Sequence, residues 1–377
     1  MYLQHLKLTD FKNYCSADLH FSSKINCFIG NNGAGKTNLL DAIYYLSFCK
    51  SYFNAADQQN IRHEREFFSI HGSYGKNGNT DLVSCVQKRN QKKSFRFNKK
   101  EYDRLADHIG KIPLVMISPY DRDLINEGSE VRRKFIDGVI AQFDPFYLDE
   151  LLKYNKAVLQ RNSLLRQFSE SGRFDSLLID ILDQQMDQSA QIIFEKRKIF
   201  LEIFTPLFRK YYTLVSGEQE QVDIKYESSL YDQNLIGMLK QSLNKDRQLR
   251  FTSVGTHKDD LNLLINGYPL KKFGSQGQQK SFVIAIKLAQ FDFTSTAMGS
   301  KPILLFDDIF DKLDDQRVEQ IIGLVGHNSF GQVFITDTQE MRVSRLFKAS
   351  SIDHQIFEVS SGNVQLQEKI STTHERS

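Results

Sequence analysis

Short runs in which apolar and polar positions alternate are frequent in the first hundred residues, and this two-residue period predicts β-strands. Residues 2–8 alternate, and residues 24–30 form a short run of the buried-strand type that ends in glycine. Apolar residues then recur at helical spacing at Leu39, Leu40, Ile43 and Leu46. The pattern therefore predicts a strand, a glycine-rich loop and a helix in that order.

Hairpins are predicted over residues 66–100, where Asn77-Gly78 is a typical tight-turn pair. Within this segment, Phe95 and Phe97 fall on one face of a strand and Arg96 on the other. The two rings are therefore expected in the core. Residues 111–118 predict a further apolar strand.

From about residue 120 to residue 250 the apolar spacing changes to that of helices. Ser129, followed by an acidic residue, is the expected N-cap of one helix. A long run from Phe174 to Tyr212 has helical spacing without sustained heptads, and Pro206 is expected to interrupt it. A compact helical insertion is predicted rather than a long coiled-coil arm.

Strands and helices alternate again after residue 250. Asn266-Gly267 predicts a hairpin, residues 302–308 and 332–338 predict inner strands, and residues 316–326 predict a helix. We therefore predict an α/β fold in which residues 1–119 and 251–377 form one domain. Residues 120–250 would form an inserted, mainly helical domain, and the last dozen residues are expected to be loose.

Composition narrows the class of protein only modestly. The 377 residues are 40% hydrophobic and 25% charged, as in ordinary globular domains, and the net charge is +3. A nucleic-acid-binding surface would therefore have to be local. The spacing of the cysteines fits neither disulfides nor zinc, and the N-terminus lacks the apolar core of a signal peptide. A soluble cytoplasmic protein is expected. The four cysteines are Cys15, Cys27, Cys49 and Cys85.

Residues 30–37 match the phosphate-loop pattern G-x-x-x-x-G-K-[ST] between a predicted strand and a predicted helix. Backbone N–H groups of such a loop face phosphates, Lys36 would neutralise the β- and γ-phosphates, and the Thr37 hydroxyl would bind Mg²⁺. The alternative is a glycine-rich turn that matches by chance. The predicted nucleotide-binding residues here are Gly30, Asn31, Asn32, Gly33, Ala34, Gly35, Lys36 and Thr37.

A phosphate loop of this type needs a carboxylate at the end of a neighbouring strand, and residues 303–308 supply two. Asp307 would hold Mg²⁺ through its water shell, and Asp308 would orient or deprotonate the attacking water. Asp308 and Lys36 are thus the predicted catalytic residues, and Thr37 and Asp307 the predicted metal ligands. The alternative is a pair of surface aspartates after a strand.

Residues 275–278 fit the capping box S-x-x-[EQ] at the start of an apolar helix. One interpretation is simply a capped amphipathic helix, with Phe282, Ala285, Ile286 and Ala289 on its buried face. The other is a second anion site, because a hydroxyl, a glycine and a helix N-terminus all favour phosphate. The predicted contacts are Ser275, Gln276, Gly277 and Gln278.

Basic residues are concentrated between positions 88 and 100. They either keep a sheet edge solvated or contact DNA phosphates without sequence preference, with help from Arg132, Arg133 and Lys134. The residues concerned are Lys88, Arg89, Lys92, Lys93, Arg96, Lys99 and Lys100.

Taken together, the motifs resemble those of ABC-type ATPase heads and, more narrowly, the RecF family of relatives of the structural-maintenance-of-chromosomes proteins. The motifs are GNNGAGKTNLLDAIYYLS, IPLVMISPYDRDLINEGSEVRRKFID, YNKAVLQRNSLL, VGTHKDDL, SQGQQKS, ILLFDDIFDKLD and VFITDT, in the family's order. The resemblance implies a head dimer that ATP and Mg²⁺ close on double-stranded DNA near single-strand junctions. Ser275 of one copy would contact the γ-phosphate held by Lys36 of the other.

The resemblance also implies slow, DNA-dependent hydrolysis of ATP to ADP and phosphate. It implies RecO and RecR as partners in recombinase loading at gaps, with links to replication and the damage response. The chain departs from the family pattern at Asp311, Thr256 and Lys258, and no glutamine fits the Q-loop of ABC-type ATPases. Asp337-Thr338 stands where ABC transporters carry a switch histidine.

Two other classes of protein share the phosphate loop. A nucleotide-binding subunit of an ABC transporter would need a coupling surface for a membrane partner, and usually the switch histidine. A kinase of small molecules would leave residues 275–280 and the Asp307-Asp308 pair without a joint purpose. Both remain alternatives at the level of sequence.

Overall fold

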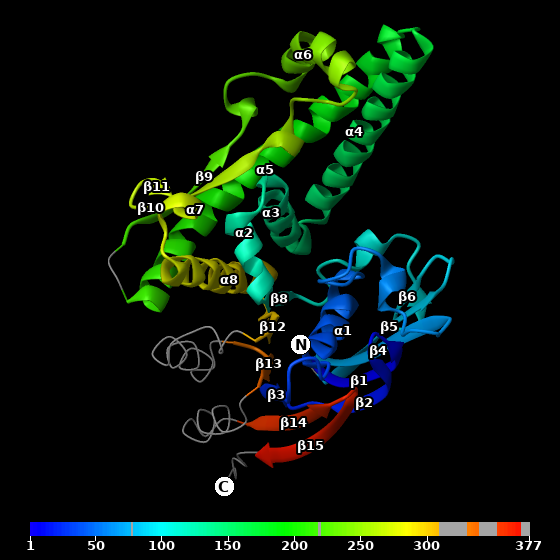
Figure 1. Ribbon diagram of the computed structural model, residues 1–377, viewed down its shortest axis with the longest axis vertical. Coiled ribbons are helices and arrows are strands. Elements are labelled where there is room, and N and C mark those ends of the chain that lie inside the picture. Colours follow the sequence, from blue (N-terminus) through cyan, green and yellow to red (C-terminus); the bar gives the residue numbers. More distant parts are fainter. Residues whose placement is uncertain (77, 218–219, 309–329, 339–352, 371–377) are drawn as a thin grey trace. The chain divides into compact units, whose positions relative to one another are not determined.

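The computed structural model describes residues 1–76, 78–217, 220–308, 330–338 and 353–370. The chain divides into two compact units. The first comprises residues 1–121, 214–216 and 286–377, and the second comprises residues 122–213 and 217–285. Both chain ends thus belong to one unit (Figure 1). The second unit extends beyond residue 250, and the predicted domain limits stay a prediction.

A six-stranded, largely parallel sheet lies at the centre of the first unit. Its strand order is β15-β14-β3-β13-β12-β8, and only β15 pairs antiparallel. Strands buried on both faces are continuously apolar, which explains why every residue of β3, β8, β12 and β13 is buried. The strands are β3 (Ile25–Ile29), β8 (Leu114–Ile117), β12 (Ile303–Phe306), β13 (Val333–Asp337), β14 (His354–Ser360) and β15 (Asn363–Ile370).

An antiparallel sheet with the order β2-β1-β4-β5-β6-β7 completes the strands of this unit. A register shift between Leu3 and His5 is a β-bulge, after which Leu6 and Leu8 are buried while Lys7 is exposed. Helix α1 (Lys36–Phe48) contacts strands of both sheets. The strands are β1 (Tyr2–Phe11), β2 (Tyr14–His20), β4 (Phe67–Lys76), β5 (Asn79–Lys88), β6 (Ser94–Phe97) and β7 (Lys100–Glu101).

The second unit is mainly helical and carries a three-stranded sheet of order β11-β10-β9. The strands are β9 (Val222–Glu227), β10 (Asp260–Ile265) and β11 (Tyr268–Pro269). The helices are α2 (Asp123–Asn126), α3 (Ser129–Phe143), α4 (Pro145–Ser171), α5 (Ser176–Ser216), α6 (Leu235–Leu249), α7 (Leu270–Phe273) and α8 (Gln276–Met298), the last of which continues into the first unit.

Two local predictions in this region are wrong. Gly128, in extended conformation, is the N-cap of α3, and Ser129 is its first helical residue. Helix α5 is 41 residues long and continues through Pro206. Buried aromatic side chains on both sides of the proline anchor the helix there: Phe200, Phe204, Phe208 and Tyr212. Strand β9 lies within the segment predicted to be mainly helical and was not itself predicted, although its alternating sequence VDIKYE has the two-residue period.

Other predictions from the pattern are confirmed. Asn266 and Gly267 both have positive φ, as a two-residue hairpin turn requires, and they join β10 to β11. Phe95 is buried and Phe97 packs against the core, while Arg96 is exposed. Residue 77, the predicted helix over residues 316–326, Asp311 and residues 371–377 lie outside the described residues. Among the described residues, no helix has the length and apolar character needed to cross a bilayer.

Candidate nucleotide-binding site

The loop between β3 and α1 has a backbone that only glycine fits at two positions. Gly30 has φ +150°, and a Cβ added there would lie 2.2 Å from the carbonyl oxygen of Val359. Gly35 has φ +117°, and its Cβ would lie 2.4 Å from Asn13 Nδ2. Any larger residue would therefore displace the chain that supports the loop.

The turn between β1 and β2 supports this loop from outside the motif. Asn13 Nδ2 donates to the carbonyl of Ala34 at 3.1 Å, and the buried Tyr14 hydroxyl donates to the carbonyl of Gly35 at 3.0 Å. Asn38 in α1 also donates to Asn13 Oδ1 at 2.7 Å. Asn13 and Tyr14 were not predicted as site residues, because nothing in the sequence indicates that this turn faces a loop about twenty residues away.

The N-terminus of α1 is open toward the loop. Its N-cap, Gly35, has no side chain, so no side chain caps the first turn. Uncapped N–H groups and the helix dipole favour an anion at this position. Lys36 places a positive charge beside the loop. Its buried ammonium donates to the carbonyls of Gly30 and Asn31 at 2.8 and 3.1 Å.

The sheet brings Asp307 to the same place. Strand β13 lies between β3 and β12, and the chain leaves all three parallel strands at one edge of the sheet. Thr37 Oγ1 donates to Asp307 Oδ1 at 2.8 Å, although the two residues are 270 positions apart in sequence. The structure therefore joins the phosphate-loop threonine to the predicted metal-binding aspartate.

Thr336, at the end of β13, connects the two aspartates. Its hydroxyl donates to Asp307 Oδ1 at 2.9 Å and accepts from the backbone N–H of Asp308 at 2.9 Å. Asp308 has φ +45°, a left-handed conformation that costs free energy in a residue other than glycine. Thr336 was not among the predicted site residues; its hydroxyl holds Asp308 in this conformation.

Burial raises the pKa of Asp307 to about 6, even though hydrogen bonds from Thr37 and Thr336 favour the charged form. The neighbouring charge of Asp308 raises the pKa of Asp307 further. A nearby cation would stabilise the charged form of such a buried carboxylate. A hydroxyl and a carboxylate oxygen are hard donors of the kind Mg²⁺ takes, so Thr37 and Asp307 fit this ion.

The capping box at the start of α8 is confirmed in full. Gln278 N–H donates to Ser275 Oγ at 3.2 Å, and the Ser275 N–H donates to Gln278 Oε1 at 2.6 Å. The Gln278 side-chain amide also donates to Glu220. These residues belong to the second unit, and their contact with a nucleotide stays a prediction.

The chain is similar to known proteins in both sequence and fold. A family model described as RecF/RecN/SMC N terminal domain matches residues 2–361. The DNA replication and repair protein RecF of Flavobacterium johnsoniae is 51% identical over 357 residues, which cover 95% of this chain and 99% of that protein. The chain belongs to the RecF family. The RecF protein of Bacteroides thetaiotaomicron, 48% identical over 363 residues, covers 96% of this chain.

Solved structures agree with membership of the RecF family. The recombination mediator protein RecF with ATP, of the RecFOR pathway, has a TM-score of 0.88 at 29% identity and covers 97% of this chain and 98% of that one. An Smc head bound to the C-winged helix domain of ScpA, at 14% identity and a TM-score of 0.59, shares the fold alone. The fold is therefore that of RecF and SMC heads, and it does not support the alternative of a small-molecule kinase.

The RecF-like motif VGTHKDDL forms a buried ionic network in the second unit. Arg197 donates to the Thr256 carbonyl at 2.9 Å and to Asp259 Oδ2 at 3.0 Å, and it pairs with Asp137. Opposite charges nearby, Asp137 first among them, raise the pKa of Arg197 despite its burial. The departure at Thr256 thus lies at a buried position where the backbone carbonyl makes the contact.

Several of the basic residues suggested for DNA contact have partners within the chain, and Lys93 and Arg132 are the least exposed of the ion-paired ones. Lys93 pairs with Asp57 at 2.6 Å and donates to the Cys49 carbonyl at 2.6 Å. Arg132 makes a two-point ion pair with Asp260, at 2.6 and 2.9 Å. Both cations therefore have carboxylate partners within the chain, and their contact with DNA stays a prediction. The exposed lysines of this hairpin are Lys88, Lys92, Lys99 and Lys100.

Proposed function

We propose that this chain is an ATP-driven switch that acts on DNA during replication and recombinational repair. The observation that carries the proposal is the junction of Thr37, Asp307 and Thr336 at one edge of the sheet, beside an uncapped helix N-terminus. The RecF relatives, and a RecF structure with ATP, support the same nucleotide. We place the protein in the cytoplasm, where ATP and the chromosome meet.

The phosphates would lie against the backbone N–H groups of residues 30–37 and the first turn of α1. The Lys36 ammonium would exchange the carbonyls of Gly30 and Asn31 for β- and γ-phosphate oxygens, which carry a full negative charge. Thr37 and Asp307 would hold Mg²⁺, which neutralises charge on the same phosphates. Each of these side chains already lies within the first unit's described site.

Hydrolysis would pass through Asp308. Its carboxylate would accept a proton from a water as the water oxygen bonds to the γ-phosphorus, and the bond from that phosphorus to the bridging oxygen would break to release ADP. The Thr336 hydroxyl fixes the Asp308 backbone. The resemblance to the RecF family implies slow turnover, so ATP would act mainly as a switch between states.

Closure of the switch would be dimerisation. The capped N-terminus of α8, with Ser275 and Gln278, would contact the γ-phosphate held by Lys36 of a second copy and so complete the site. Double-stranded DNA next to single-strand junctions would be bound without sequence preference, and RecO and RecR would be partners in recombinase loading. The exposed lysines of residues 88–100 would be the DNA contacts within the first unit.

The test is to measure the mass of the particle in solution with ATP, ADP and a non-hydrolysable analogue, with and without DNA. We expect dimers with ATP and the analogue only. Lys36→Ala should remove ATP-dependent dimers, and Asp308→Asn should keep ATP binding, slow hydrolysis at least about 100-fold and accumulate dimers. A wild-type chain that binds ATP but stays monomeric at all concentrations with every DNA would overturn the proposal.

A further inference from the structure

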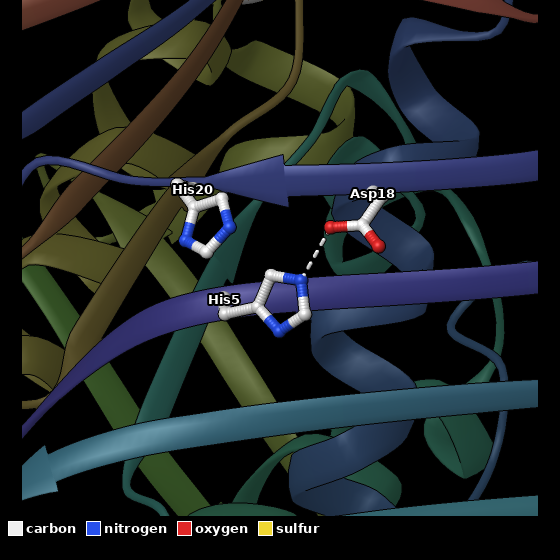
Figure 2. A group of neighbouring side chains, drawn as sticks. All are labelled: His5, Asp18 and His20. Carbon is white, nitrogen blue, oxygen red and sulfur yellow. Dashed lines mark hydrogen bonds and ion pairs between the residues drawn. The ribbon is translucent and has the colours of Figure 1, made fainter.

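Two histidines and an aspartate meet on the outer face of the antiparallel sheet, and none of them belongs to the nucleotide-binding residues described above. His5 of β1 lies directly opposite His20 of β2 in the antiparallel register, and Lys7 lies opposite Asp18. The bulge at the start of β1 turns Leu6 and Leu8 into the core and leaves His5 and Lys7 on the outer face. Figure 2 shows the three side chains gathered on one side of the two strands.

The three side chains are already in contact. His5 Nε2 and Asp18 Oδ1 are 2.6 Å apart, and the rings of His5 and His20 are stacked with centroids 4.4 Å apart. One ligand atom from each residue lies within 4.8 Å of the other two. In the part of the chain that the structure describes, this is the one group of three or more histidine, cysteine or acidic side chains close enough to share a metal ion.

The donor set selects the kind of ion. Neutral imidazole nitrogens bind zinc, copper and nickel, whereas Mg²⁺ takes oxygen ligands almost exclusively. Two histidines and one carboxylate, with a water at the fourth position, are a frequent zinc arrangement. We propose that His5, Asp18 and His20 form a binding site for a divalent transition-metal ion, with Zn²⁺ as the best fit.

Binding of an ion requires the His5 and His20 rings to turn out of their stacked arrangement, because the nitrogen lone pairs of near-parallel rings do not converge, and it requires the ligand atoms to move closer together. Zinc bonds of about 2.0–2.2 Å in tetrahedral geometry place ligand atoms roughly 3.4 Å apart, so the side chains must approach one another by little more than 1 Å. Asp18 and His20 are exposed, so their side chains can turn once the hydrogen bond to His5 and the ring stacking are released. The ion would replace the His5–Asp18 hydrogen bond with two stronger bonds from the same side chains.

The surroundings tolerate the added charge. Lys7 Nζ is 3.9 Å from Asp18, but the lysine side chain is 57% exposed and can turn into solvent. Asp18 also borders a polar cleft of about 490 Å³, which leaves room for a fourth ligand from solvent. The cleft is lined by Lys7, Ser16, Ala17, Asp18, Leu19, Asn363, Val364 and Gln365.

A metal at this position would join β1 to β2 at the end of the hairpin opposite its turn. Because ligands that bind only the folded chain stabilise it by mass action, Zn²⁺ should raise the thermal midpoint of the wild-type chain. The turn of the same hairpin carries Asn13 and Tyr14, which support the phosphate loop. The proposed site nevertheless stands independently of the proposed function.

The test is calorimetric titration of the full chain with Zn²⁺ in the absence of nucleotide, with Mg²⁺ titrated in parallel. The variants are His5→Ala, His20→Ala and Asp18→Asn, and the matched control is His63→Ala, whose side chain is 94% exposed. Any zinc that binds elsewhere on the chain would bind every variant equally, so the difference from wild type measures this site. Circular dichroism establishes that each variant is folded.

We expect one equivalent of Zn²⁺ to bind wild type and His63→Ala with equal affinity, and Mg²⁺ not to compete. Each histidine substitution should weaken this binding at least tenfold, since even supporting residues of metal sites contribute 10- to 100-fold. The rise in thermal midpoint should be lost with it. Equal zinc affinity in wild type and both histidine variants, or an equal loss in His63→Ala, would overturn the proposal.

Discussion

Thr336 shows how much of the site depends on a single hydroxyl at the end of a strand. It bonds both aspartates and holds the left-handed backbone of Asp308. Thr336→Val keeps the shape of the side chain and removes the hydroxyl. Two hydrogen bonds are lost, and the one from the Asp308 backbone supports hydrolysis. We expect ATP affinity to change little and kcat to fall about tenfold, which corresponds to roughly 1.4 kcal/mol for that bond.

The measurement is steady-state hydrolysis together with direct nucleotide binding. Thr336→Ser is the control, because it restores the hydroxyl and should recover most of the rate. An unchanged kcat in Thr336→Val would show that Asp308 does not depend on this bond.

His108 makes the stability of the first unit sensitive to acid. Burial lowers the pKa of His108 to about 4, and its Nε2 lies 2.7 Å from the carbonyl oxygen of Leu46. The folded chain therefore binds this proton less readily than the unfolded chain, whose histidine titrates near 6.5. Stability is unaffected above pH 6.5 and is lost as the pH falls toward 4, by about 3 kcal/mol in total.

The free energy of unfolding, measured by denaturant titration at several pH values between 7 and 4, tests this expectation. His108→Phe can occupy the same aromatic surroundings of Phe95 and Tyr102 without a titrating group. Its stability should be lower at pH 7, because the Leu46 carbonyl loses a partner, but should decline less steeply with acid. A slope equal to that of wild type would exclude His108 as the cause.

At the level of elements, the start of α8 combines a helix cap with a proposed phosphate contact, and the two roles can be separated. Ser275→Ala removes the cap and should cost about 1 kcal/mol of stability. Ser275→Asp keeps an N-cap oxygen but places a negative charge where the γ-phosphate of the second copy would lie. We expect Ser275→Asp to retain the wild-type thermal midpoint and to lose ATP-dependent dimers.

Unfolding midpoints and particle mass with ATP distinguish these outcomes. Full dimerisation of Ser275→Asp would leave the capping box with a structural role alone. The cap itself, being a contact between residues three apart, was predictable from the sequence; the extra bond from Gln278 to Glu220 was not, because it joins segments 58 residues apart.

At the level of the whole molecule, the proposed affinity for DNA should depend on exposed lysines alone. Replacing Lys92, Lys99 and Lys100 together with glutamine should weaken binding, and each lost phosphate contact should reduce the slope of log affinity against log salt by about 0.9. Lys93 is left in place because it holds Asp57 and the Cys49 carbonyl.

Fluorescence anisotropy across a salt series measures this slope. A control with the same loss of charge replaces Lys240, Lys245 and Arg250, all exposed in the second unit. An unchanged slope in the first variant, or an equal reduction in both variants, would show that the basic hairpin does not contact DNA specifically and only keeps the sheet edge solvated.

The sequence by itself determined those features whose residues are neighbours in the chain. The glycines of the phosphate loop, the capping box and the Asn266-Gly267 turn each meet a local backbone requirement, so their spacing alone predicted them. The buried strands were predictable for the same reason, because a strand covered on both faces must be continuously apolar.

Tertiary structure decided which distant residues meet. Strand order placed the Thr336 hydroxyl within hydrogen-bonding distance of Asp307 and of the Asp308 backbone. The β1–β2 turn brought Asn13 and Tyr14 to the phosphate loop, and the antiparallel register brought His5 to His20. It also assigned Lys93 to an internal ion pair. No local pattern encodes such partners, because register and strand order depend on the packing of the whole unit rather than on the propensity of any one segment.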